Sequence, residues 1–108
     1  MAAEEETLVE VHDVTVQRVK GNTFRVTANG VVRTSGWVVN LHPVVYIKPP
    51  ENWMIDAVGI KPTGIVKEVI SPWEASVEMN LSKETIRISV RGMSLKGEKQ
   101  MVTEAVPW

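Results

Sequence analysis

The sequence contains no cysteine. Thiolate metal sites, redox motifs and a cysteine nucleophile are therefore excluded. Small secreted domains often compensate for a small core with disulfides, so the absence fits a reducing compartment, and we expect a cytoplasmic protein. The N-terminus begins Met1-Ala2-Ala3 and continues with three glutamates, without the basic and apolar regions of a signal peptide. A removed signal peptide would leave no trace in the sequence.

Long hydrophobic runs and an excess of one charge are also missing. No apolar stretch approaches the roughly 20 residues that a membrane-spanning helix needs. The chain carries 12 basic and 13 acidic residues, which gives a formal net charge of -1. Such a balance provides no electrostatic footprint for nucleic acid or for an anionic membrane. The sequence therefore predicts neither of them as a partner.

Catalytic motifs are absent from the sequence. The only two histidines are His12 and His42. His12 adjoins Asp13, but neighbours in a strand point to opposite faces, so this adjacency forms no dyad. His42 precedes Pro43, which favours an extended strand end at the surface. We expect no catalytic residue and no enzyme activity.

Metal and cofactor motifs are missing as well. Zinc would require both histidines and carboxylates from distant parts of the chain, without a local motif. The densest acidic run is 4–6, which fits a mobile N-terminal segment over residues 1–7. The glycines are dispersed and form no phosphate-binding loop. The sequence predicts no metal and no cofactor.

The feature that is present is a two-residue hydrophobic period. Phe24, Val26 and Ala28 alternate with polar residues, which predicts a strand with one buried face. The inward parity switches between residues 11 and 14, which predicts either a β-bulge near His12-Asp13 or a break between two short strands.

A second pair of alternating runs indicates a hairpin over residues 75–90. The run 75–81 and the run 86–90 both alternate, with Ser82-Lys83-Glu84 between them. Pairing them places Leu81 opposite Ile86, which predicts an antiparallel hairpin between the two runs.

The segment 48–73 is broken by proline and glycine, and we expect loops around short strands at 54–58 and 65–70. The β-branched run 44–47 precedes it and is expected to be covered on both faces. About seven or eight strands in a chain of this length predict one all-β domain over 8–108, an antiparallel β-sandwich. An immunoglobulin-like topology is the leading expectation, and a small β-barrel is the alternative.

Tryptophan is the one abundant aromatic residue, with four copies against one tyrosine and one phenylalanine. Trp37 fits a strand and the core of a sandwich. Trp53 and Trp73 adjoin proline-rich sequence and are expected in loops. Such residues either cover the ends of a small sandwich or form a contact surface, and their average burial favours the first interpretation.

These observations favour a non-catalytic binding or structural module. The expected partner is a protein or peptide, or a second copy of the chain, contacted through edge strands and the loops of 48–73. Tyr46, Trp53 and Trp73 are the candidate binding residues. One alternative is a carbohydrate-binding module that uses the loop tryptophans. A second alternative is a small hydrolase or metal-binding domain around His12 and His42.

Overall fold

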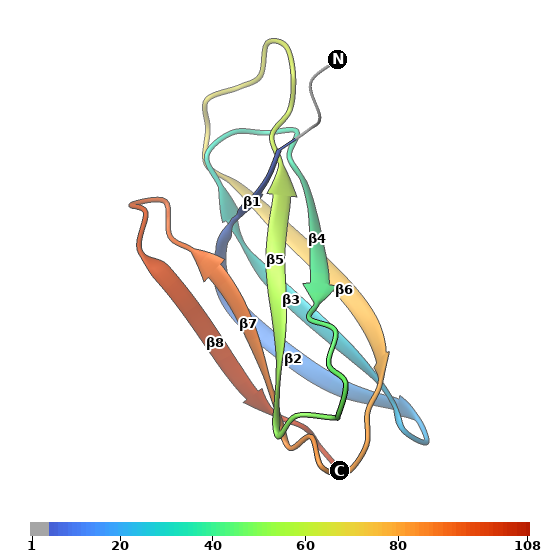
Figure 1. Cartoon of the computed structure of the whole chain (residues 1–108). Helices are drawn as coiled ribbons and strands as arrows, with labels where there is room; N and C mark the ends of the chain where they lie inside the picture. The colour runs from blue at the N-terminus through green and yellow to red at the C-terminus, as the bar shows by residue number, and fades with distance from the viewer. Residues whose placement is uncertain (1–4) are drawn as a thin grey trace.

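Two β-sheets pack face to face in the computed structural model, which describes residues 5–108 (Figure 1). The larger sheet has five strands and the smaller sheet has three. The eight strands are β1 (Glu6–Leu8), β2 (Glu10–Lys20), β3 (Thr23–Val32), β4 (Val38–Pro43), β5 (Asn52–Ile60), β6 (Ser71–Asn80), β7 (Arg87–Met93) and β8 (Lys99–Ala105). Within the described residues, no helix is long and apolar enough to cross a membrane.

The three-stranded sheet has the order β2-β3-β6, with antiparallel pairing throughout. β2 and β3 are joined by a tight turn in which Gly21 has a φ of 55°, a conformation that glycine adopts without steric cost. The register between β2 and β3 shifts between Val11 and Asp13. This shift confirms the β-bulge that the parity switch predicts.

The five-stranded sheet is centred on β5, which pairs with β4 on one side and with β1 and β7 on the other. β8 extends the sheet beyond β7. β5 and β7 run parallel, whereas every other pair is antiparallel. The predicted β-sandwich is confirmed. The parallel pair lies outside the antiparallel immunoglobulin pattern, so that finer topology is not established.

The expected hairpin between 75–81 and 86–90 is wrong. β6 pairs with β3 in the smaller sheet, whereas β7 pairs with β5 and β8 in the larger one. The intervening loop crosses from one sheet to the other, and Ile86 is exposed. An alternating pattern reports which face of a strand is buried, but it does not identify the neighbouring strand.

Three further expectations differ from the structure. The run 44–47 is not covered on both faces, because Val45 and Ile47 are almost fully exposed at 93% and 104%. The segment 65–70 forms no strand, whereas 54–58 lies within β5 as expected. The predicted mobile segment 1–7 overlaps β1, which pairs with β5; residues 1–4 lie outside the described residues.

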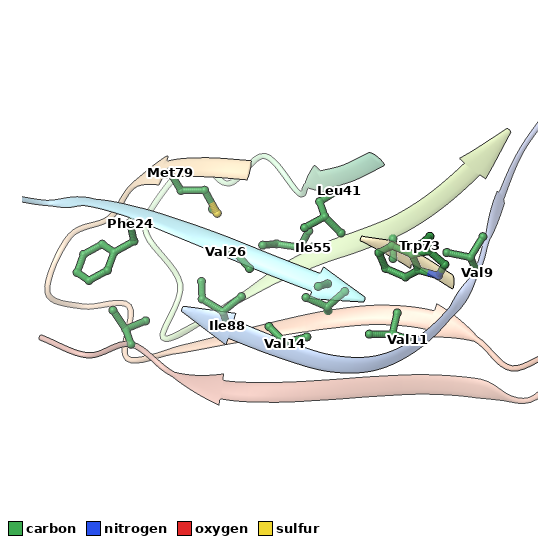
Figure 2. Packing of buried hydrophobic residues seen from close by; sticks show 14 of the residues in the cluster. Val9, Val11, Val14, Phe24, Val26, Leu41, Ile55, Trp73, Met79 and Ile88 are labelled. Atoms are coloured by element: carbon green, nitrogen blue, oxygen red, sulfur yellow. The ribbon is translucent and has the colours of Figure 1, made fainter. Parts of the chain in front are cut away.

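The core lies between the two sheets and is built from the inward positions of the strands (Figure 2). Phe24 and Val26 of the smaller sheet meet Ile55, Ile88 and Val90 of the larger sheet, and all five side chains are fully buried. Burial of side chains of this size contributes about 1.5–3 kcal/mol each to stability. The sandwich is therefore held by its inner faces without disulfides.

Candidate interaction surface

Trp73 lies in strand β6 and not in a loop, and it is only 8% exposed. Its indole N–H donates to the main-chain oxygen of Glu10 at 2.9 Å. A Cβ on Gly30 would overlap that same oxygen, so the absence of a side chain there allows β2 and the indole to approach β3. Trp73 is a core residue that ties two strands together.

Trp53 also lies in a strand, β5, and packs against the core. Its ring meets Tyr46 edge-on, with ring centroids 5.1 Å apart. The Tyr46 hydroxyl accepts a hydrogen bond from the backbone N–H of Met54 at 3.4 Å. Tyr46 and Trp53 therefore lie together, but Trp73 is in the opposite sheet, so the three predicted binding residues form no common site. For the same reason Trp53 and Trp73 cannot form a paired platform for a sugar.

The two histidines lie in different sheets, His12 on β2 and His42 on β4. Nε2 of His12 lies 2.7 Å from the Glu10 carboxylate, and Nδ1 of His42 lies 3.4 Å from that of Glu6. Among the described residues, no group of three or more histidine, aspartate or glutamate side chains is arranged to hold a metal ion. The structure therefore brings His12 and His42 into no shared site.

One end of the sandwich is filled by the C-terminal residues, which lie beside the β4–β5 and β6–β7 connections (Figure 1). Trp108 packs edge-on against Phe24, with ring centroids 4.9 Å apart. Its indole N–H donates to the main-chain oxygen of Thr85 at 2.9 Å. The buried Thr85 hydroxyl donates in turn to the main-chain oxygen of Pro50 at 2.6 Å. We call this region the filled end.

The opposite end leaves a pocket of about 180 Å³ between the ends of the two sheets. It is bounded by β1, by the ends of β3 and β7, and by the loops that follow them. Most of its wall is apolar, and the lining residues include Leu8, Val9, Val31, Trp37, Met93 and Leu95. We call this region the hollow end.

Glu10 fixes the rim of this pocket. Its carboxylate accepts a hydrogen bond from the backbone N–H of Leu95 at 3.0 Å, and the Arg33 guanidinium donates to the main-chain oxygen of Leu95. The hydrogen bond from Leu95, assisted by His12, lowers the pKa of Glu10 below its ordinary value. The β7–β8 turn is thus held in place by polar contacts while the Leu95 side chain lines the pocket. The sequence carries no local signal for this network, because its members are far apart in the chain.

Exposed aliphatic side chains lie at the same end of the sandwich, on the segment that joins β5 to β6 (Figure 1). Ile65 is fully exposed at 105%, and Val69 and Ile70 are 54% and 61% exposed. The segment is bonded to the β3–β4 loop through the N–H of Ser35 and the oxygen of Lys67, at 3.3 Å. The β3–β4 loop also contains Trp37, which lines the pocket. The same loop therefore contacts both the pocket and the aliphatic segment.

Comparison of this chain with models of protein families, with curated proteins and with solved structures gives no match.

Proposed function

We propose that this domain binds a partner polypeptide through its hollow end. The partner inserts an apolar side chain into the pocket, and its flanking residues cover the aliphatic side chains of 65–70. The proposal accords with the expectation of a protein-binding module that uses the proline- and glycine-rich segment. The observation that carries it is an apolar pocket at the same end of the sandwich as exposed isoleucine and valine side chains.

The pocket has the properties of a side-chain receptor. A dry cavity of about 150 Å³ lined by aliphatic residues is large enough for a benzene-sized group. The Glu10 and Arg33 contacts fix the backbone of Leu95, so the rim is ordered before a partner arrives. A pre-formed site loses less conformational entropy on binding, which favours affinity.

The exposed aliphatic residues add contact area. Ile65 receives no stabilisation from burial in the isolated chain, whereas covering such a side chain contributes about 1.5–3 kcal/mol. Exposed apolar side chains gathered next to a concave site are typical of protein-interaction surfaces.

The test compares two fully exposed isoleucines, one near each end of the sandwich. Ile65 lies at the hollow end, and Ile47 lies in the β4–β5 connection at the filled end. Partners captured by the wild-type chain are quantified against Ile65→Lys, Leu95→Lys and Ile47→Lys. The partner is then purified and titrated against each variant by calorimetry.

We expect Ile65→Lys and Leu95→Lys each to weaken binding by about tenfold or more, which is the effect of losing a contact of about 1.4 kcal/mol. Ile47→Lys should bind as the wild type does. Full binding by both hollow-end variants, or equal loss with Ile47→Lys, would contradict the proposal.

A further inference from the structure

The outer faces of the two sheets differ in chemistry. Alternate residues of β3 and β6 face solvent on the three-stranded sheet, and they pair across the strands through polar side chains at 2.7–2.8 Å: Thr23–Asn80, Arg25–Glu78 and Thr27–Ser76. The polar side chains of this face are exposed and bond to one another. Such a face is the usual exterior of an antiparallel sheet.

The five-stranded sheet has a much more apolar exterior. On β5, the residues that alternate with the buried Ile55 and Ala57 point away from the core. Residues of β1 and β4 that pair with these outward residues face the same side of the sheet. The apolar side chains on this outer face are Leu8, Val38, Met54, Val58, Ile60 and Met101. Val38 and Met101 are 57% and 56% exposed. The same register places Glu6, His42 and Arg87 on this face, so its exterior is mixed, although it is more apolar than that of the smaller sheet.

A hollow and a protruding side chain adjoin each other on this face. The hollow has a volume of about 510 Å³ and is lined by Leu8, Asp56, Arg91, Lys99 and the exposed Met101, among others. Met101 is paired with Arg91 across β7 and β8, so it stands at the border of the hollow. Methionine is flexible and polarizable, and it fills irregular apolar gaps well.

Within the hollow, the charges of Asp56 and Arg91 compensate each other. Nε of Arg91 donates to one oxygen of Asp56 at 2.6 Å, and an Nη donates to the other at 3.1 Å. A thioether can enter beside this pair without leaving either charge unpaired. Lys99 can lay its methylene stem along the entering side chain and keep its ammonium group in water.

We propose that the outer face of the five-stranded sheet binds a second copy of this chain, forming a two-fold dimer in which Met101 of each copy enters the hollow of the other. A knob and a hollow side by side on one surface satisfy the self-complementarity that a two-fold interface requires. Leu8 borders both this interface and the pocket of the hollow end, but Met101 and Arg91 do not line that pocket, so the dimer does not depend on the proposed function.

The size of the face supports a dimer of modest affinity. Five strands spaced about 4.8 Å apart and about six residues long cover about 500 Å². Two copies would therefore bury about 1,000 Å², close to the lower limit for a specific interface. We expect a reversible dimer that forms in the micromolar range of protein concentration.

Sedimentation velocity over a concentration series tests the proposal. The wild-type mass should rise from that of one chain towards that of two. Met101→Lys should weaken association by about tenfold or more, because the dimer would bring a second ammonium group against Lys99 in the hollow. Val19→Glu, at an exposed valine of the smaller sheet, and Ile65→Lys should associate as the wild type does. The second control separates this result from the proposed function.

A wild-type chain that stays monomeric, or a Met101→Lys variant that associates normally, would overturn the proposal. Amide chemical shifts of the wild-type chain provide a second measurement that needs no substitution. On dilution, the shifts should change at Leu8, Arg91 and Met101. Changes confined to the polar pairs of β3 and β6 would equally overturn it.

Discussion

At each end of the sandwich, the space between the two sheets must be covered or left open, and the two ends differ in this respect. At the filled end, Trp108 and Thr85 bind neighbouring loops to one another and cover Phe24. At the hollow end, Trp37 and Leu95 stand around a pocket and leave it accessible. In a protein of this size, the space between two sheets is thus closed at one end only.

The difference shows that exposed aliphatic residues alone do not identify the interaction surface. Both ends have them, since Val45 and Ile47 near the filled end are as exposed as Ile65. The hollow end adds a concave apolar site whose rim is fixed by Glu10. Concavity together with ordered walls favours the hollow end as the place where a partner binds.

The largest expected effect is on stability at the filled end. Phe24→Ala should cost about 3–5 kcal/mol, because it removes a fully buried ring and the contact with Trp108. Leu95→Ala at the hollow end should cost much less, since its side chain lines a pocket that is already present. Urea unfolding of both variants measures the difference. Equal costs would show that the two ends are packed alike.

Thr85 provides a second, smaller comparison. Thr85→Val keeps the shape of the side chain but leaves the main-chain oxygen of Pro50 without its donor, which should cost about 1–3 kcal/mol. Thr63→Val, in the exposed β5–β6 segment, is the matched substitution and should change the unfolding free energy by less than about 0.5 kcal/mol. A neutral Thr85→Val would mean that the hydroxyl does not hold the filled end together.

The hollow end should respond to acid through Glu10. Its pKa is lowered in the folded chain, so its contacts stabilise the protein above the unfolded-state pKa, and that contribution is lost as pH falls through the lowered value. We therefore expect the unfolding free energies of the wild type and Glu10→Gln to converge as pH falls. Parallel curves, measured by urea unfolding at several pH values, would contradict this role of Glu10.

The smallest effect is expected at the exposed isoleucines. Ile65→Lys and Ile47→Lys should each change the unfolding free energy by less than about 0.5 kcal/mol, because neither side chain is buried. Thermal unfolding of both variants checks this. A marked loss of stability in Ile65→Lys would show that the β5–β6 segment is a structural cover and not a contact surface.

Sequence patterns were sufficient for the faces of strands but not for their neighbours. Alternation identified the inward positions of β3, and the parity switch located the bulge between Val11 and Asp13. It could not show that β6 pairs with β3 or that β5 and β7 are parallel, because any strand with one buried face has the same pattern.

The prediction of site residues from the sequence failed for the same reason, because it used only neighbouring residues in the chain. Trp73 was assigned to a loop because of the adjacent Pro72, yet an edge strand such as β6 tolerates proline. The pocket depends on Leu8, Trp37 and Leu95, which come together only when β1, the β3–β4 loop and the β7–β8 turn are assembled. No short sequence window could have indicated it.

The most direct test of the account is the binding of a small apolar probe followed by amide chemical shifts. Benzene added to the wild-type chain should shift the signals of Leu8, Val31 and Leu95 around the pocket, because the pocket is apolar and of suitable volume. Signals of Phe24 and Trp108 at the filled end should not move. Shifts at the filled end alone, or at neither end, would contradict the claim that the hollow end is the binding site.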